Sequence, residues 1–545
     1  MKQNVALIGL GKYAKYIYLP YMKQEGINLA FVVDLENKKE EILSYLKNRG
    51  IEDVRFFGIT KSSENAKHLD KEFATQLKAI CNLLEISHFI VSTDIKAHYR
   101  YIEFALKNKI PVLCDKTLVM SSRKTNRIRT FTTSRQYKEL EKLEKKKETS
   151  CYFLSETEYN PIYIYAKKIL NSFIHKYQIP ITYIDIYESD GEWKMPHEFR
   201  NKTMNGKVFQ NGYSYIYLLS SFLKMNQELP HHKKIVKGYV YSDKFTLKDE
   251  LSYMTKEDYK RLFVNQNIPD EYYLKKKFKV KYNCEDNFYS SLNFQNNRGQ
   301  TITHVNMNLL HYGLSNRSNI DSEIDYKRNI QERIHISIGT LLDMKIISLI
   351  NDEGKEEMEL TIAYNQALLE KKEMEVIHSK ELYENSDEDY IVEKPVKEYL
   401  SRFLHNQELK GNLKDHALSM ELLRSSVKSM QSITQRKKRI HVVKLNPTLS
   451  VESLKPYACL DNVDEEKKLI NTKIRSLDED VCGVVINKLK LKKAYEIYYY
   501  YDDGEDVASE LCYVMTRSKI KAKFIYLWYS KIANPKKKLT QLIKK

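Results

Sequence analysis

The hydrophobic positions of the first 114 residues come in short runs separated by amphipathic segments. An apolar run at 5–8 leads into Gly9-Leu10-Gly11, and a second run at 29–33 ends at Asp34. The segments between such runs have the three- to four-residue spacing of a helix face. The further predicted elements are helices at 38–49, 74–84 and 99–107 and strands at 54–57, 89–91 and 111–114. Strands that alternate with helices of this length predict a doubly wound α/β fold with a parallel sheet.

The pattern changes at 124–149, where dense charges predict a solvent-facing helix. A strand at 151–154 and a helix ending at Leu170 follow. Later apolar runs predict strands at 181–187, 237–241, 301–310, 333–338, 343–349 and 358–363, then helices at 396–404 and 418–433 and a strand at 439–443. We interpret this region as an α+β domain with a large, mainly antiparallel sheet.

Asn446-Pro447 marks the next boundary, because proline ends regular structure and restricts the residue before it. Strands predicted at 481–491 and 494–501 suggest a hairpin in a small α+β extension. The acidic cluster at 502–506 is predicted to be a solvated loop. Basic and aromatic residues alternate over 517–538. This pattern is typical of a helix that packs by its aromatic face. It is also typical of a segment that contacts an anionic polymer or a partner protein.

The chain has 545 residues and a net charge of +18, which can indicate an anionic partner. Lysine is abundant throughout rather than in one patch, so nucleic-acid binding is not favoured. The 7 cysteines form no Cys-x-x-Cys pair or metal-ligand spacing, which favours free thiols in a reducing compartment and no metal. No stretch approaches the length of apolar sequence needed to cross a membrane. We therefore expect a soluble cytoplasmic protein.

The turn at Gly9 carries the first chemical signal. Gly9 would allow a sharp turn, Gly11 a close approach to a pyrophosphate, and the small Ala14 close packing of the helix on the strand. Lys12 and Tyr13 complete the predicted phosphate-binding turn, whose helix N-terminus offers free N–H groups. A strand-turn-helix unit without a cofactor would have a similar sequence. The residues that follow therefore decide between cofactor binding and a purely structural turn.

Asp34 favours cofactor binding, because it lies where the ribose-binding acid of a dinucleotide fold belongs. A carboxylate there favours NAD over NADP, since it repels a 2′-phosphate. Lys12, Lys38 and Lys39 lie near these residues in the sequence, so binding of NADP stays an alternative. The alternative is an exposed Asp without a cofactor role.

Several residues also line up in order with one known family. Gly9, Gly11 and Ala14 match its glycine motif, Pro20 a proline of its first helix, and Asp34 its ribose acid. Ser92-Thr93-Asp94 with His98 is similar to its Thr-Pro and His after the fourth strand, and Cys114-Asp115-Lys116-Thr117 stands where it has Glu-Lys-Pro. On these residues the chain resembles the Gfo/Idh/MocA family, relatives of glucose-fructose oxidoreductase and inositol dehydrogenase, over roughly 1–444.

The length of 545 residues predicts about three domains. The resemblance implies the first two, a Rossmann dinucleotide-binding domain at 1–123 and an α+β substrate and oligomerisation domain at 124–444 whose C-terminal helix returns to the first. An extension of unknown role at 445–545 lies outside it. The resemblance also implies that Ser92, Thr93, His98, Asp115 and Lys116 contact the cofactor. The lysine would lie near the nicotinamide ribose and the reacting substrate oxygen. An ammonium there can stabilise developing negative charge.

The segment 206–217 departs from the family pattern. With Gly212 aligned, Gln210, Ser214 and Tyr217 replace an Asp, the proton-transferring His and a second Asp. A free serine hydroxyl is no general base at neutral pH. Tyr213 or Tyr217 could relay the proton with the lysine, or these tyrosines could pack between the domains. Gln210, Ser214 and Tyr217 remain predicted substrate contacts.

A second candidate for proton transfer is His197, which with Trp193 could line a sugar pocket. The sequence thus predicts an NAD(P)-dependent oxidoreductase that acts on a hydroxyl or carbonyl carbon of a sugar-like metabolite. The alternative is a catalytically degenerate NAD(P)-binding regulator or scaffold that acts through a protein partner, with 445–545 as a contact. The family's sheet leads us to expect a dimer or tetramer.

Overall fold

The computed structural model divides the chain into two compact units, Met1–Pro447 and Thr448–Lys545, which are described separately. It describes residues 3–11, 13–60, 66–115, 130–191, 206–210, 212–230, 232–262, 285–315, 331–350, 356–369, 374–382, 393–434, 440–444, 481–488, 494–501 and 509–515. Among these, no helix is both long enough and apolar enough to cross a membrane.

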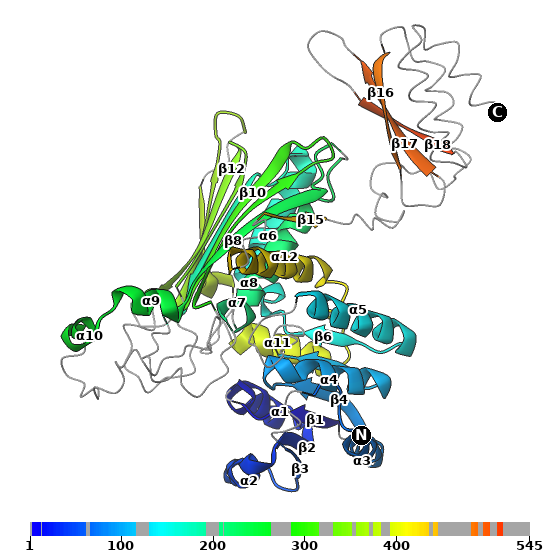
Figure 1. Cartoon of the computed structure of the whole chain (residues 1–545), viewed down its shortest axis with the longest axis vertical. Coiled ribbons are helices and arrows are strands. Elements are labelled where there is room, and N and C mark those ends of the chain that lie inside the picture. The colour runs from blue at the N-terminus through cyan, green and yellow to red at the C-terminus, as the bar shows by residue number, and fades with distance from the viewer. Residues whose placement is uncertain are drawn as a thin grey trace. The chain divides into compact units, whose positions relative to one another are not determined.

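The first unit begins with a parallel sheet in the strand order β3-β2-β1-β4-β5-β6 (Figure 1). Its strands are β1 (Asn4–Ile8), β2 (Asn28–Leu35), β3 (Arg55–Ile59), β4 (Ile86–Val91), β5 (Val112–Cys114) and β6 (Cys151–Phe153). Its helices are η1 (Ala14–Tyr18), α1 (Leu19–Gln24), η2 (Glu36–Lys38), α2 (Lys39–Asn48), α3 (Lys71–Leu83), α4 (Ile95–Lys107) and α5 (Thr130–Lys147). The predicted doubly wound fold is confirmed, and its sheet runs past residue 123 to β6.

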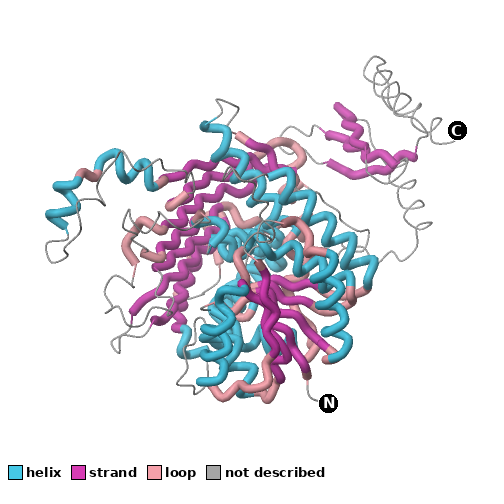
Figure 2. The backbone as a smooth tube through the Cα atoms, turned by 60° about the horizontal axis from the view of Figure 1, so that its bottom comes forward, coloured by secondary structure: helices cyan, strands magenta, loops and turns pink. Residues whose placement is uncertain are grey.

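Helices lie on both faces of this sheet (Figure 2), and a cluster of buried apolar side chains packs between sheet and helices on each face. Leu77, Ile102 and Leu140 bring α3, α4 and α5 to one face. η1, α1 and α2 cover the other face together with α11 (Glu393–Leu404), a helix from far along the chain. Because both faces are covered, the central strands read as continuous apolar runs rather than as alternating patterns.

The second sheet has nine strands in the order β14-β13-β12-β11-β7-β10-β9-β8-β15. They are β7 (Tyr183–Ser189), β8 (Lys237–Phe245), β9 (Asn287–Gln295), β10 (Thr301–Leu310), β11 (Gln331–Ile338), β12 (Leu342–Ile350), β13 (Glu356–Tyr364), β14 (Glu375–His378) and β15 (His441–Lys444). All neighbours run antiparallel except β7 and β10. The predicted large, mainly antiparallel sheet is therefore confirmed.

Helices cover one face of this second sheet (Figure 1). They are η4 (Glu156–Glu158), α6 (Pro161–Tyr177), α7 (Lys207–Gln210), α8 (Gly212–Met225), η9 (Ser379–Leu382) and α12 (Ala417–Thr434), of which α6, α8 and α12 supply most of the shared core. Two further helices, α9 (Leu247–Tyr253) and α10 (Lys256–Leu262), follow β8 and extend beyond the end of the sheet (Figure 1). Strand β9 was not predicted. Its Phe288, Leu292 and Phe294 are buried, but serine and asparagine between them weaken the apolar signal.

The link from α11 to α12 passes over the edge of the parallel sheet. The Tyr399 hydroxyl donates to the carbonyls of Phe153 (2.8 Å) and Lys410 (2.6 Å), and the Phe153 N–H donates to the carbonyl of Gly411 (2.8 Å). Strand β6 is thus bonded to residues that follow it by 246 positions (Tyr399) and 258 positions (Gly411). These bonds hold α11 and the link to α12 against the edge strand of the parallel sheet.

The second unit contains an antiparallel sheet of β16 (Val481–Lys488), β17 (Ala494–Tyr501) and β18 (Ser509–Met515). The predicted hairpin corresponds to β16 and β17, whereas β18 was not predicted. The acidic cluster at 502–506 and the basic and aromatic segment at 517–538 lie outside the described residues.

Gly411 offers a test of this arrangement. Its φ is +89°, and a Cβ atom there would lie 2.6 Å from the Tyr399 hydroxyl and 2.8 Å from the Phe153 carbonyl oxygen. We expect Gly411→Ala to lower the free energy of unfolding by about 2–4 kcal/mol, from backbone strain and overpacking together. Gly299→Ala is the matched control, because its φ is +80° with nothing within 4 Å, and it should cost about 1 kcal/mol. Denaturant titration of both variants measures the difference, and equal costs would contradict the described packing.

Candidate functional site

The turn at Gly9 lies where the strand order of the parallel sheet reverses, between β1 and β4. Gly9 has a φ of +90°, and a Cβ atom would lie 2.5 Å from the Ser92 carbonyl oxygen. Its N–H donates to the Val33 carbonyl (2.7 Å), and the Ser92 N–H donates to the Ile8 carbonyl (2.8 Å). Only glycine fits where three strand ends meet this closely.

Asp34 is held directly beneath this turn. One carboxylate oxygen accepts the N–H of Leu10 (2.9 Å) and the other accepts the N–H of Leu35 (2.7 Å). A carboxylate offers about four acceptor directions, so the group can still accept bonds from ribose hydroxyls. It is 9% exposed, at the floor of the turn.

The helix after the turn starts as predicted. Ala14 is fully buried, so η1 packs closely on the sheet, and the Lys15 N–H donates to the Gly11 carbonyl (3.0 Å). Tyr13 is half-buried with its ring against Tyr18, at 5.3 Å between centroids. Lys12 lies outside the described residues.

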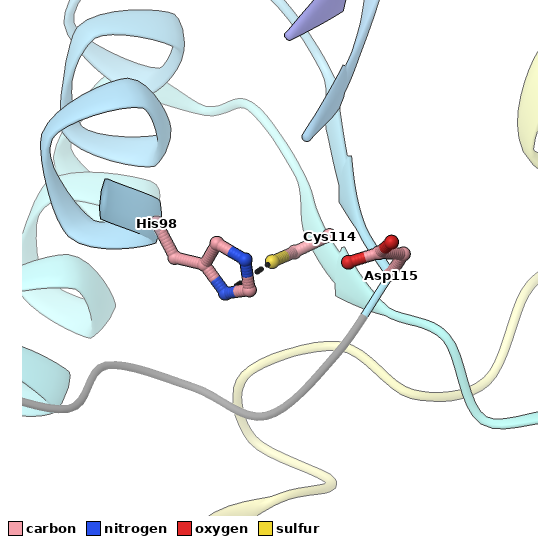
Figure 3. Close-up of side chains that lie close together, drawn as sticks. All are labelled: His98, Cys114 and Asp115. Atoms are coloured by element: carbon pink, nitrogen blue, oxygen red, sulfur yellow. Dashed lines mark hydrogen bonds between the residues drawn. The ribbon is translucent and has the colours of Figure 1, made fainter. Parts of the chain in front are cut away.

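The ends of β4 and β5 bring the next predicted residues together (Figure 3). His98, from the first turn of α4, donates from Nε2 to the Thr93 carbonyl (3.0 Å). This bond leaves Nδ1 to accept the Cys114 thiol, at 3.1 Å. The Ser92 hydroxyl donates to the Asp115 carboxylate. The four predicted cofactor residues Ser92, Thr93, His98 and Asp115 therefore share one edge of the sheet.

His98, Cys114 and Asp115 also offer ligand atoms within 4.8 Å of one another, a spacing at which a metal ion could be held. However, the hydrogen bond from the Cys114 thiol occupies the ring nitrogen that an ion would need. The Cys114 thiol and the His98 ring therefore satisfy each other's hydrogen-bonding groups without a metal. We infer that this hydrogen bond joins α4 to β5.

Tyr213, in α8, lies in a buried polar network. Its hydroxyl is 2.8 Å from Nδ1 of His416 and 2.9 Å from the Ser419 hydroxyl. Burial raises the pKa of Tyr213 above its usual value. Tyr217, one turn later, stacks on the His416 ring at 4.3 Å, and burial raises its pKa as well.

His416 is the centre of this network. Burial, with a further effect of the Lys224 ammonium, lowers its pKa to about 3, so the ring is neutral. Its Nε2 lies 3.1 Å from the Ser155 hydroxyl, just after β6. The sequence analysis did not select His416 or Ser155, because neither stands in a motif.

A second buried cluster, also missed, anchors the start of α7. Lys207 is fully buried, and its ammonium lies 2.7 Å from a Glu188 carboxylate oxygen and 2.8 Å from Asp190. His311 lies 2.7 Å from Asp190. Burial alone would raise the pKa of Asp190, but Lys207 and His311 hold it well below its usual range. The sequence carries no motif that marks this lysine as buried.

The predicted substrate residues are only partly described. Ser214 is half-buried in α8, and Gln210 is the last residue of α7, with a side chain outside the described part. Lys116, Trp193 and His197 also lie outside it. The structure thus brings Ser92, Thr93, His98 and Asp115 together at one edge of the sheet, and the cofactor and substrate roles of the predicted residues stay predictions.

Comparison with solved structures gives distant likenesses. An oxidoreductase from Agrobacterium radiobacter, in complex with NAD+, L-tartaric acid and magnesium, is 13% identical with a TM-score of 0.44, over 82% of this chain and 98% of that one. Aldose-aldose oxidoreductase from Caulobacter crescentus, complexed with glycerol, is 12% identical with a TM-score of 0.49, over 82% and 100%. A super-repressor mutant of Gal80p from Saccharomyces cerevisiae is 14% identical with a TM-score of 0.49, over 82% and 98%.

No curated protein matches the chain by sequence. Residues 3–148 do match a family model, that of the Gfo/Idh/MocA oxidoreductases, described as an oxidoreductase family with an NAD-binding Rossmann fold. The match spans the Gly9 turn, Asp34 and the edge that carries Asp115. Residues 3–148 therefore match the NAD-binding Rossmann domain of the Gfo/Idh/MocA oxidoreductases, the family that the sequence resembles.

Proposed function

We propose that this protein is an NAD(P)-dependent oxidoreductase that transfers hydride to or from a hydroxyl or carbonyl carbon of a sugar-like metabolite. The observation that carries the proposal is the Asp34 carboxylate, held by two backbone N–H groups under the Gly9 turn at the switch point of the sheet. A carboxylate in this position can accept hydrogen bonds from the two hydroxyls of the adenosine ribose. It favours NAD over NADP because its negative charge repels a 2′-phosphate.

Each part of the site has a distinct task in this proposal. The turn from Gly9 to Ala14 would hold the pyrophosphate and Asp34 the adenosine ribose, while Ser92, Thr93, His98 and Asp115 shape the edge beside the nicotinamide. The bound dinucleotide supplies or accepts the hydride. Lys116 follows Asp115, whose backbone N–H donates to the Val91 carbonyl (3.0 Å) and so fixes where the lysine segment begins. We propose that Lys116 polarises the substrate oxygen.

Proton transfer then falls to Lys116 or His197. The contribution of Tyr213 and Tyr217 stays a prediction. Burial raises the pKa of both hydroxyls, and Tyr213 is committed to His416 and Ser419. A general acid or base works best with a pKa near the working pH, so their surroundings favour a packing role.

That same network supports a second candidate, a catalytically degenerate NAD(P)-binding regulator or scaffold. Here the helix that carries the family's proton-transfer residues has become a packing surface between α12 and β6. Such a protein would keep the nucleotide site and act through a protein partner. A homodimer or homotetramer is compatible with both candidates.

The nucleotide site can be tested by a substitution that prevents the close approach of the Gly9 backbone to the Ser92 carbonyl. In Gly9→Ala the new methyl group would collide with the Ser92 carbonyl, so we expect the dissociation constant for NADH to rise at least ~10-fold, on the order of 1.4 kcal/mol. Gly26→Ala is the control, because Gly26 has a φ of +65° with nothing within 4 Å, and it should bind NADH normally. Nicotinamide fluorescence measures both. Unchanged binding by Gly9→Ala would mean that the turn is only structural.

Turnover separates the two candidate functions. With NADH or NAD and a panel of sugars and nucleotide sugars, the oxidoreductase should change the nicotinamide absorbance. Lys116→Ala should lower kcat about 100-fold or more while NADH still binds. Lys107→Ala, which removes a surface lysine paired with Glu103, should leave kcat unchanged. Normal NADH binding without turnover on any substrate would favour the regulator.

The state of His416 predicts how stability depends on pH. Its pKa is lowered in the fold to about 3, so the unfolded chain binds the proton more readily below its ordinary value of about 6.5. Stability should therefore fall by up to about 1.4 kcal/mol per pH unit as the pH drops below 6.5. His416→Gln should flatten this slope, whereas His405→Gln, at an exposed site, should not. Denaturant titrations between pH 7 and 4.5 would show this, and identical slopes would refute a neutral His416.

A further inference from the structure

Lys207 is a fully buried cation at the start of α7. Its ammonium lies 2.7 and 2.8 Å from the two carboxylate oxygens of Glu188 and 2.8 Å from a carboxylate oxygen of Asp190. All three N–H groups of the ammonium can therefore donate to carboxylates at the end of β7. Replacing a buried ion pair by apolar side chains is often neutral or stabilising, so stability alone does not account for a charge at this position.

The ion pairs of Lys207 lie at the ends of two neighbouring strands. Nδ1 of His311, which follows β10, lies 2.7 Å from the same carboxylate of Asp190, which follows β7. Strands β7 and β10 run parallel and pair from Tyr183 to Ser189, so both of these residues lie at the same end of the second sheet. The start of α7 is thereby fixed to two central strands of that sheet.

The backbone of Lys207 extends these contacts to α8. Its N–H donates to the carbonyl of Glu285 (3.0 Å), just before β9, and a Cβ atom on Gly206 would collide with the Glu285 carboxyl group. A Cβ atom on Gly212, the first residue of α8, would lie 3.1 Å from the Lys207 carbonyl oxygen and 2.8 Å from the Leu309 side chain. Packing this close leaves little room for a shift. Lys207 therefore connects the ends of β7, β9 and β10 to the beginning of α8.

We propose that Lys207 is a positioning residue for the substrate side of the site. By fixing α7 and the start of α8, it sets the places of Gln210 and Ser214, the predicted substrate contacts. Its own side chain is fully buried in the cluster and does not touch the reacting atoms. A misplacement of about 1 Å caused far from the chemistry can lower a rate about 100-fold. This inference rests on the proposed function, because it assumes that a substrate binds beside α8.

Two variants of the full-length protein separate positioning from stability. Lys207→Met removes the cation from between two buried carboxylates, so we expect a lower midpoint of denaturant unfolding and a fall in kcat/KM of about 100-fold. In the double variant Lys207→Met/Glu188→Gln both charges of the pair are gone and Asp190 keeps His311, so the midpoint should recover. Its kcat/KM should stay at least ~10-fold below that of the unmodified protein. The dissociation constant for NADH, from nicotinamide fluorescence, should be unchanged in both.

Lys167→Met is the matched control, since the Lys167 ammonium lies 2.7 Å from Glu158 and the two side chains are only 14% and 7% exposed. It breaks a second largely buried ion pair, so the midpoint should fall while kcat/KM is unchanged. Turnover is followed by nicotinamide absorbance, with the sugar or nucleotide sugar that the unmodified protein converts fastest.

Three results would overturn the role of Lys207 alone. They are recovery of kcat/KM together with the midpoint in the double variant, failure of the double variant to fold, and an equal loss of kcat/KM in Lys167→Met. Absence of turnover by the unmodified protein on every sugar and nucleotide sugar, with or without NADH binding, would overturn both this role and the proposed oxidoreductase.

Discussion

The missing side chain of Gly9 is the constraint on which the nucleotide domain depends. It allows the ends of β1, β2 and β4 to approach within hydrogen-bonding distance, through the bonds of Gly9 to Val33 and of Ser92 to Ile8. The same turn directs the Leu10 N–H at Asp34 and so orients the ribose acid. A methyl group at this position would separate the strand ends. The first turn therefore sets both the sheet geometry and the charge at its edge.

Polar groups in this protein are buried in pairs that come from distant parts of the chain. Tyr213 and His416 are 203 positions apart, and Asp190 and His311 are 121 apart. Each pair satisfies groups that would be costly to bury alone. At the three positions where the resembled family has Asp, His and Asp, this chain has Gln210, Ser214 and Tyr217, and Tyr217 stacks on the neutral His416 ring. The result is a buried polar junction between α8, the start of α12 and the end of β6.

Features that depend on residues close together in the sequence were predicted, whereas features that depend on distant partners were not. The Gly9 turn, Asp34 and the strand at 112–114 follow from short apolar runs and nearby glycines, and all were identified. Strand β9 escaped because serine and asparagine interrupt its apolar residues, although Phe288 and Phe294 are buried. The His416 network and Lys207 could not be found, since a buried histidine or lysine has meaning only through a partner more than a dozen residues away. The places of Gly9 and Asp34 in the fold were thus predictable, and the packing of α8 was not.

The position of α11 has a consequence for how the chain reaches its fold. Val5, Leu7 and Tyr18 of the first domain pack in one cluster with Val396, Tyr399 and Phe403. These side chains come from β1 and η1, yet the helix that covers them follows nearly 400 residues later, since α11 begins at Glu393. Until α11 has been synthesised, the part of this face that it covers stays exposed, and exposed apolar surface of this kind invites aggregation. A fragment that ends near residue 150 would carry the complete glycine motif and still lack part of its own core. The core of the nucleotide domain is therefore complete only when a helix from far along the chain has joined it.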